Sequence, residues 1–265
     1  MASPSVYGHD AQVNFTGTQL ATSSCDKTIR VFDVNVKDGS QFFVEELKGH
    51  QGPVWQVAWG HPSFGTYLAS CSYDRKVIIW KETRETKPDG KLIVKWDTSF
   101  VYEGHDSSVN SVCWAPPSWS QCRVLAPADA PNFDKTDGTK QIKRFASGGC
   151  DNLVKIWREE NDQWVEETKL VGHTDWVRDV AWSPGAGLSK RKIASCSQDR
   201  KVIIWVNKQG DGMSYTPEPL HVFPDVIWHI SWNLVGDVLA VSGGDNQVSF
   251  VKLFSTLSVS NCDEC

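Results

Sequence analysis

Serine, histidine and aspartate recur in this chain in a set order, and they are the residue types of a hydrolase triad. Two sets share the order histidine, serine, aspartate, tryptophan: His50, Ser70, Asp74 and Trp80 in the first, and His173, Ser195, Asp199 and Trp205 in the second. An active site is needed once, whereas this constellation is repeated along the chain. The repetition favours a structural role, in which a buried imidazole and carboxylate satisfy each other's hydrogen bonds.

These sets belong to a longer repeat that predicts the elements around them. Five aspartates follow strands of small residues, and each is followed shortly by an aromatic residue: Asp26 and Phe32, Asp74 and Trp80, Asp151 and Trp157, Asp199 and Trp205, and Asp245 and Phe250. Four of the five units carry an upstream histidine: His9, His50, His105 and His173. This self-similarity is typical of an all-β propeller built from WD repeats, and it predicts five repeat units.

One unit shows the expected blade. Residues 42–47 are predicted as its outer strand and residues 54–59, which alternate apolar and polar side chains, as its inner strand. Residues 68–72 and 76–80 supply two further strands, joined by a tight turn at Asp74. The pattern therefore predicts a four-stranded antiparallel sheet. Because each blade packs only on its neighbours, we expect residues 1–265 to form a single domain.

The composition of the chain limits the classes of partner that it is expected to bind. The 265 residues carry a net charge of −5, so the chain lacks the basic surface that nucleic-acid binding requires, and protein partners are favoured. No run of residues approaches the length of a membrane span, and the N-terminus does not resemble a signal peptide. We therefore expect any membrane association to be indirect.

The eight cysteines do not indicate a disulfide scaffold. Four of them lie within strand patterns, where a thiol behaves as a small apolar group: Cys71, Cys113, Cys150 and Cys196. A reducing, intracellular compartment is the simpler interpretation. Cys262 and Cys265 form a single CxxC pair, whereas a structural zinc site needs four ligands. We expect neither a metal nor another cofactor.

Several stretches carry a resemblance to one family, and it covers most of residues 10–249. They are GPVWQVAW (52–59), LASCSYDRKVIIW (68–80), GHDSSVNSVCWAP (104–116), RFASGGCDNLVKIW (144–157), HTDWVRDVAWSP (173–184) and LAVSGGDNQV (239–248). They resemble the small WD-repeat subunit of the COPII outer coat, which also serves in the Y-shaped complex of the nuclear pore outer ring.

The resemblance implies a non-catalytic scaffold that takes part in ER-to-Golgi transport and in the nuclear pore. It implies a six-bladed propeller that is left open, into which a larger partner inserts a further blade. The partner would be the long COPII coat subunit on vesicles and an α-helical nucleoporin at the pore. The expected locations are the cytoplasmic side of the ER membrane, COPII vesicles and the nuclear envelope.

The chain departs from this family in two places. Five units are present where the resemblance implies six, and the defect lies between Trp114 and Arg144, where parts of two repeats are joined in phase. The join runs through residues 116–143, which are rich in Pro, Asp and Lys and predict a long loop. An irregular tail is predicted for residues 252–265, because they do not resume the repeat.

An open propeller leaves sheet edges that another chain's strands can pair with. We expect the partner at the seam between the first unit and the last, with the contact residues Val13, Phe15, Val248 and Phe250, and with Phe32 further inside. The alternative is that these residues are ordinary core positions of the terminal blades.

Two other function classes are weighed against the scaffold. A closed propeller would serve as a general adaptor that binds a peptide on its top face. Trp55, Trp176, Arg178 and Trp228 lie at the start of inner strands, and two interpretations stay open for them: binding contacts at the central channel or the top face, or packing between blades. An enzyme would need a single cluster of acid, base or nucleophile that does not repeat. The sequence shows no such cluster, so we do not expect catalysis.

Overall fold

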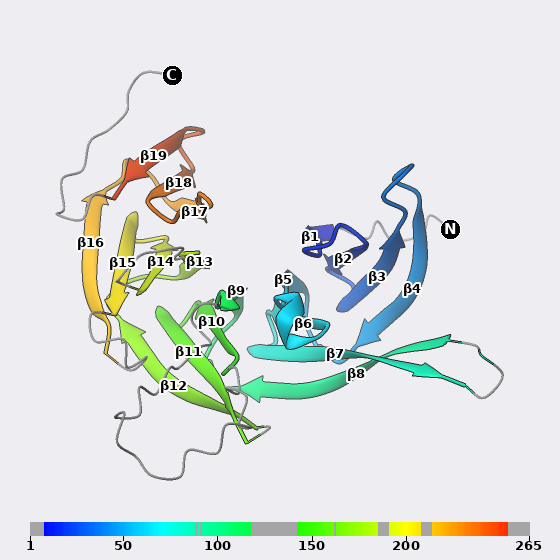
Figure 1. The fold of residues 1–265 in the computed structure, drawn as a ribbon. Helices are drawn as coiled ribbons and strands as arrows, with labels where there is room; N and C mark the ends of the chain where they lie inside the picture. Colours follow the sequence, from blue (N-terminus) through cyan, green and yellow to red (C-terminus); the bar gives the residue numbers. More distant parts are fainter. Residues whose placement is uncertain are drawn as a thin grey trace, which may run out of the picture.

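The computed structural model describes residues 8–87, 90, 92–117, 142–161, 163–184, 191–207 and 214–253. These residues form five antiparallel sheets, called blades 1 to 5 here, which are arranged as an arc (Figure 1). One short 3-10 helix, η1 (Pro62–Phe64), is the helical element among them. None of the described helical segments has the length and apolar character needed to cross a membrane.

The strands follow one another in chain order from the inner to the outer edge of each blade. Blade 1 contains β1 (Gly8–Val13), β2 (Gln19–Ser24), β3 (Thr28–Val34) and β4 (Gln41–Lys48). Blade 2 contains β5 (Val54–Trp59), β6 (Tyr67–Ser72), β7 (Lys76–Thr86) and β8 (Leu92–Glu103). Blade 3 contains β9 (Val109–Trp114), β10 (Arg144–Gly149), β11 (Leu153–Glu160) and β12 (Gln163–Val171). Blade 4 contains β13 (Val177–Trp182), β14 (Arg191–Ser197), β15 (Lys201–Asn207) and β16 (Thr216–Val222). Blade 5 contains β17 (Ile227–Trp232), β18 (Val238–Gly243) and β19 (Val248–Lys252).

The repeated aspartates sit in the hairpin turn between the second and third strands of each blade. In blade 2 the Asp74 carboxylate accepts the backbone N–H of Lys76, and Arg75 has a φ of 71°. The residue after the aspartate takes a positive φ in each of the five turns: Lys27, Arg75, Asn152, Arg200 and Asn246. The aspartate therefore stabilises a turn whose backbone conformation is otherwise unfavourable for side chains other than glycine.

One strand was predicted to belong to the wrong blade. Residues 42–47 were expected to be the outer strand of the blade that contains Trp80, but β4 pairs with β3 in blade 1. The outer strand of blade 2 is β8, which pairs with β7. The turn at Gly49 and His50 therefore connects two blades instead of two strands of one sheet. One sequence repeat spans the outer strand of one blade and three strands of the next.

Apolar clusters lie between neighbouring blades. Ile29 of blade 1 packs in one cluster with Trp59 and Trp80 of blade 2, and Ile204 of blade 4 packs in another with Ile230 and Leu239 of blade 5. The second strands of the middle blades are the most deeply buried, as all six residues of β6 and of β10 are, because a neighbouring blade covers each of their faces. The blades are thus held together face to face by burial of apolar side chains.

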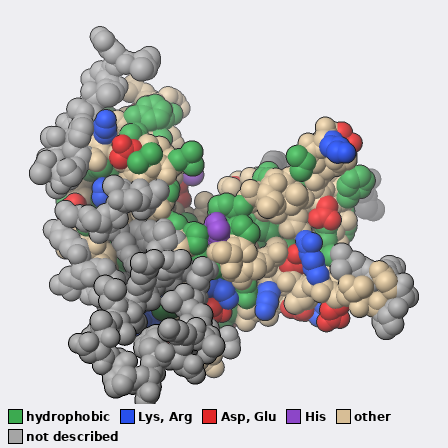
Figure 2. All heavy atoms as spheres, in the orientation of Figure 1, with side chains coloured by type: hydrophobic (Ala, Val, Ile, Leu, Met, Phe, Trp, Pro, Cys, Tyr) green, Lys and Arg blue, Asp and Glu red, His purple; other side chains and the backbone are tan. Residues whose placement is uncertain are grey.

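The arc does not close among the described residues. Inner strands contact each other in the order β1, β5, β9, β13 and β17, and a gap separates blade 5 from blade 1 (Figure 1). The space-filling view shows this gap as a notch bordered by hydrophobic and histidine side chains (Figure 2). The predicted all-β WD propeller with five units and an open ring is confirmed.

The in-phase join between two repeats gives a complete sheet. Phe145 of β10 pairs with Trp114 of β9, and β11 and β12 continue the same blade. Most of the loop predicted for residues 116–143 lies outside the described residues. At the C-terminal end, β19 runs through Lys252, so the predicted tail starts later than expected, and residues 254–265 with Cys262 and Cys265 also lie outside the described part.

Packing between blades 4 and 5 predicts a large cost for truncating Ile204, which is 2% exposed. Ile204→Ala should lower the free energy of unfolding by about 2–5 kcal/mol, because it removes buried methyl groups and leaves a cavity. Urea unfolding followed by tryptophan fluorescence measures the change. Val222→Ala is the control, since Val222 is 57% exposed and its truncation should change stability by less than about 0.5 kcal/mol. Equal effects of the two substitutions would contradict the packing described.

Candidate functional site: a repeated buried network and an open seam

The predicted histidine, serine, aspartate and tryptophan sets come together in space. In blade 2, His50 Nδ1 lies 2.9 Å from Asp74 Oδ2, and His50 Nε2 lies 2.8 Å from Ser70 Oγ. Trp80 Nε1 donates to the same serine oxygen at 2.9 Å. With the imidazole proton on Nδ1, the histidine donates to the aspartate and the serine donates to the histidine, so each buried polar atom has a partner.

Blade 4 repeats this geometry with the second predicted set. His173 lies 3.0 Å from Asp199 and 2.8 Å from Ser195, and Trp205 donates to Ser195 at 2.8 Å. The aspartate also accepts the backbone N–H of Thr174, which follows the histidine. The network therefore ties the turn that enters the blade to the hairpin between its second and third strands.

Blade 3 contains a third set of the same kind, which was not predicted from the sequence. His105 contacts Asp151 at 2.8 Å and Ser147 at 2.8 Å, and Trp157 donates to Ser147 at 3.0 Å. His105 and Asp151 were both recognised as members of the repeat, but Ser147, which completes the set, was not. It lies in the small-residue strand at the same distance from the tryptophan as Ser70 and Ser195 do.

His9 was grouped with His50, His105 and His173 as an upstream histidine of the repeat, but its place in the fold is different. It lies within β1 instead of in the turn before an inner strand. Its Nε2 contacts Cys25 Sγ at 2.8 Å, and its ring packs against Trp55 at 4.6 Å between centroids. The offset between repeat and blade explains the difference, because the network histidine always precedes its inner strand.

Burial decides against catalysis at these sets. The serines of all three are fully buried, and the histidines are at most 7% exposed: Ser70, Ser147, Ser195, His50, His105 and His173. A nucleophile must reach a substrate carbonyl, and a hydroxyl packed between two sheets cannot. What the geometry provides is a fixed connection between turns and strands.

Hydrogen bonding holds the network aspartates in the charged form. Burial alone raises the pKa of Asp199, but the hydrogen bonds from His173 and from the backbone of Thr174 outweigh it and lower that pKa to about 2. The same contributions lower the pKa of Asp74 and of Asp151. The folded state therefore binds these protons more weakly than the unfolded chain does.

The second candidate site is the pair of sheet faces that border the gap. On blade 1, cross-strand pairing places four apolar residues in one row on the face turned away from blade 2: Val13, Leu20, Phe32 and Phe43. Phe32 and Phe43 contact each other edge to face at 5.9 Å between ring centroids. We call this surface the open face of blade 1.

Blade 5 presents a matching surface. Phe250, Ala240 and Ser231 are opposite each other across β19, β18 and β17, and Val248 pairs with Ser242, which pairs with His229. These six residues form the open face of blade 5. Among the described residues, no fourth strand pairs with the outer edge of β19, so this blade has an open edge as well as an open face.

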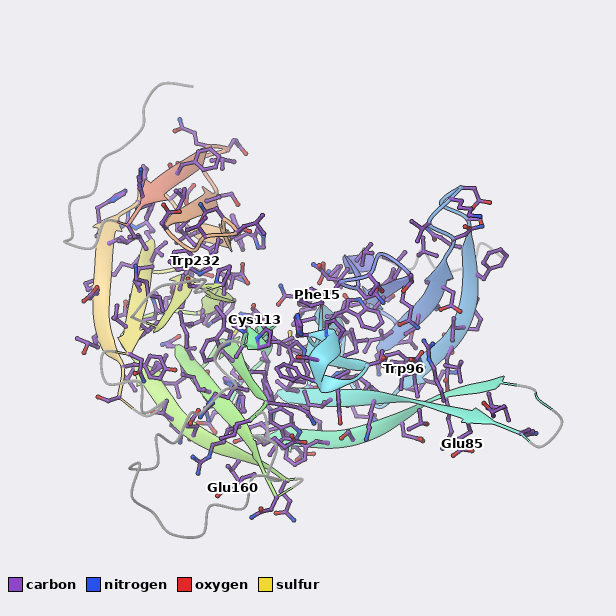
Figure 3. All side chains as sticks on the ribbon, in the orientation of Figure 1. Phe15, Glu85, Trp96, Cys113, Glu160 and Trp232 are labelled. Carbon is purple, nitrogen blue, oxygen red and sulfur yellow. The ribbon has the colours of Figure 1, made fainter. Side chains whose placement is uncertain are left out.

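Three of the four predicted seam residues lie on these faces. Val13, Val248 and Phe250 are 55%, 59% and 57% exposed. Phe15 lies elsewhere, since its ring packs on His61 in the blade 2 loop at 5.1 Å between centroids. Figure 3 shows Phe15 beside blade 2 and Trp232 on blade 5, on the two sides of the gap. Phe15 therefore belongs to the junction of blades 1 and 2.

Comparison with known proteins supports the repeat assignment. The sequence matches the family described as WD domain, G-beta repeat, over residues 3–33, 41–81, 96–118 and 164–206. It is 45% identical to Protein SEC13 homolog of Drosophila melanogaster, over 92% of this chain and 77% of the relative. Identity to Protein SEC13 homolog of Homo sapiens is 47%, over 92% of this chain and 85% of the relative. The chain belongs to the SEC13 family of WD-repeat proteins.

A fungal relative extends the same result. Protein transport protein SEC13 of Scheffersomyces stipitis is 41% identical, over 91% of this chain and 90% of the relative. The alignment with the Drosophila protein spans 285 positions, more than the 265 residues of this SEC13-family chain. The relative therefore has residues with no counterpart here, as expected if one repeat is lost.

The lowered pKa of Asp199 predicts how this SEC13-family protein responds to acid. The ionised carboxylate stabilises the fold fully above its ordinary pKa of 3.8, and this contribution is lost as the pH falls towards about 2. Asp199→Asn should lower the free energy of unfolding near neutral pH by about 1–3 kcal/mol, because it leaves polar groups unsatisfied. It should also reduce the loss of stability between those two pH values.

Urea unfolding as a function of pH measures both effects, with Asp106→Asn as the control, since Asp106 is exposed. An unchanged acid response in Asp199→Asn would show that this carboxylate does not contribute to the pH dependence.

Proposed function

We propose that this chain is a non-catalytic scaffold subunit in protein transport whose open propeller accepts a β-blade from a larger partner. One observation carries the proposal. Val248 and Phe250 on blade 5 occupy the positions that Val202 and Ile204 occupy on blade 4, by their pairing with the second strand. Val202 and Ile204 are at most 2% exposed because blade 5 covers them, whereas the blade 5 residues are more than half exposed.

Blade 1 gives the same contrast on the other side of the gap. Trp59 and Trp80 on blade 2 are buried against blade 1, at 7% and 3% exposure. Their counterparts on blade 1 are Val13 and Phe32, which no blade formed by the described residues covers. The two open faces thus carry side chains suited to an interior, and apolar surface of this kind marks an interaction site.

A blade is the occupant that suits both faces at once. It has two apolar sides, and it would bury the open face of blade 1 and that of blade 5 in one step. Its outer strands would also lie near β19, whose outer edge is open to strand addition. A short peptide would cover one face and leave the other exposed.

The family suggests the assemblies in which this happens. The curated relatives carry the names SEC13 homolog and protein transport protein. We therefore assign this chain to the COPII coat of ER-to-Golgi vesicles, with the long outer-coat subunit as blade donor, and to the nuclear pore, with an α-helical nucleoporin as donor. It would act on the cytoplasmic side of the ER membrane and at the nuclear envelope, and it would reach membranes only through partners.

A second candidate is a peptide adaptor, and one cluster favours it. The Arg178 guanidinium lies 5.1 Å from the ring centre of Trp176 and 4.6 Å from that of Trp228. Both tryptophans are partly exposed, and Trp and Arg are common in binding hot spots. The adaptor was expected on a closed ring, however, and the described residues form an open arc.

The scaffold proposal predicts that a charge on the open face of blade 5 blocks the partner. Phe250→Asp should weaken binding of the N-terminal, blade-donating segment of the long coat subunit by about 10-fold or more, since a buried carboxylate without a partner is costly. Co-expression, affinity purification and size-exclusion chromatography of the complex measure this.

Val171→Asp is the matched control, because Val171 is 71% exposed on the outer strand β12, away from the gap. Binding of the coat segment by the Phe250→Asp variant at the level of the control would contradict the seam assignment. Loss of binding only when Trp176 is replaced by alanine would favour the adaptor.

A further inference from the structure

A hydrogen bond repeats at every junction between described inner strands. The third residue of one inner strand accepts, through its side chain, the backbone N–H of the fourth residue in the next inner strand. The pairs are Asp10 Oδ2 with Val57 N at 3.2 Å, Gln56 Oε1 with Val112 N at 2.8 Å, Ser111 Oγ with Val180 N at 3.1 Å, and Asp179 Oδ2 with Ile230 N at 3.0 Å. Asp, Gln and Ser all serve, so the position requires an acceptor and not one residue type.

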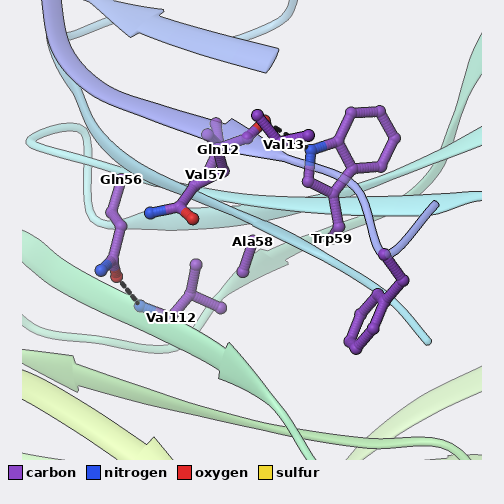
Figure 4. Close-up of a pocket in the computed structure, with 8 residues that line it drawn as sticks. Gln12, Val13, Gln56, Val57, Ala58, Trp59 and Val112 are labelled. Atoms are coloured by element: carbon purple, nitrogen blue, oxygen red, sulfur yellow. Dashed lines mark hydrogen bonds between the residues drawn. The ribbon is translucent and has the colours of Figure 1, made fainter. Parts of the chain in front are cut away.

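A second bond runs in the same direction at three of these junctions. The sixth residue of an inner strand is a tryptophan whose indole N–H donates to the fifth carbonyl of the preceding inner strand. These bonds are Trp59 to the Gln12 carbonyl at 2.8 Å, Trp114 to Ala58 at 2.9 Å and Trp232 to Ala181 at 3.1 Å. Figure 4 shows one bond of each kind, from Trp59 to Gln12 and between Gln56 and Val112.

Both series of bonds reach the gap at blade 5. The third residue of β17 is His229, whose Nδ1 lies 2.6 Å from Asp179 Oδ2 and whose side chain is 64% exposed. With Nδ1 used in this way, Nε2 is the ring atom left to accept. The fifth residue is Ser231, and no side chain in the described part of the protein donates to its carbonyl. Blade 5 therefore carries, at the gap, the two acceptors that correspond to those used at the other junctions.

The blade 1 edge is different. Its sixth residue is Val13 where the other inner strands have tryptophan, so it has no indole to donate. The backbone N–H of Ala11, its fourth residue, donates to Asp10 Oδ1 at 2.8 Å, and the equivalent N–H of Val180 makes the same bond to Asp179 while it also donates to Ser111. Blade 1 thus brings apolar surface and one backbone N–H to the gap, while blade 5 carries the acceptors.

We propose that His229 and the Ser231 carbonyl form the recognition site for the inner strand of the incoming blade. That strand presents a backbone N–H to His229 and, two residues later, a side chain with an N–H donor, for which tryptophan is the type used inside this chain. This inference rests on the proposed function, since it specifies how the partner's blade is held.

The physical reason for such a site is register. Apolar burial is not directional, so the open faces alone would allow the incoming strand to slide along β17. Two hydrogen bonds spaced by two residues fix both the position and the direction of that strand. An N–H that enters the interior without an acceptor also carries a penalty, so a strand in the wrong register is rejected.

The test uses two substitutions at one position. His229→Leu removes the acceptor, whereas His229→Gln keeps one. Glutamine suits this position, since Gln56 accepts the backbone N–H of Val112 at the junction of blades 2 and 3. The probe is the blade-donating coat segment, titrated into the full chain at mildly alkaline pH. Alkaline pH is chosen because the hydrogen bond to Asp179 and the charges of Asp179 and Asp10 raise the pKa of His229, while burial lowers it, and the acceptor role requires the neutral ring.

We expect His229→Leu to bind the coat segment about 10-fold more weakly than wild type, and His229→Gln to bind within about 3-fold of wild type. In the coat segment, replacing the N–H donor at the sixth position of its inner strand by phenylalanine should weaken binding to a similar extent. Circular dichroism and thermal unfolding would test that both variants fold, which we expect because the His229 side chain is 64% exposed.

The outcomes separate this inference from the function on which it rests. If Phe250→Asp abolishes binding while His229→Leu and His229→Gln bind equally well, the recognition site is overturned and the scaffold stands. If the wild-type chain does not bind the coat segment, or if neither Phe250 nor His229 affects binding, both proposals are overturned.

Discussion

The blades of this protein pack face to face through apolar side chains, and another blade is the element that matches such a face. The rest of the structure depends on this constraint. Apolar clusters between sheets account for the burial of Ile204 and Trp80, and they fix the order of the blades along the arc. A ring meets the constraint by closing, whereas the described part of this arc leaves one face of blade 1 and one of blade 5 uncovered.

Polar groups in this fold hold the apolar layers in register. In blades 2 to 4 the histidine, serine and aspartate sets connect the turn before the inner strand to the hairpin beyond it, as His50 and Asp74 do in blade 2. Side-chain acceptors on the inner strands, such as Asp179, connect one blade to the next. Burial supplies most of the stabilising free energy, while these bonds select one arrangement among many that would bury similar area.

Local patterns allowed much of this to be predicted. The five hairpin turns could be located because an aspartate recurs in each and is followed shortly by an aromatic residue, and Trp80 could be assigned to a strand end. The boundary between blades could not be found this way, because a repeat in sequence need not start where a sheet starts. β4 was therefore given to the wrong blade, and His9 was grouped with the upstream histidines although it lies within an inner strand.

The positions of the seam residues could also be predicted only in part. Val13, Val248 and Phe250 were predicted from chain position, and alternating side chains place them on the open faces. Phe15 follows the end of β1, where alternation no longer determines direction, and it packs on His61. The hydrogen bonds between inner strands were not predicted, because their acceptors differ in residue type and are recognised only by their common position.

The central claim is that the gap is completed by a partner's blade. Hydrogen exchange of the full chain, with and without the blade-donating coat segment, tests it most directly, because it reports each strand separately. The account predicts slower exchange in β1, β17 and β19 when the segment is present and unchanged exchange in β12. Protection confined to the residues around Trp176, or no protection at β1 and β19, would contradict it.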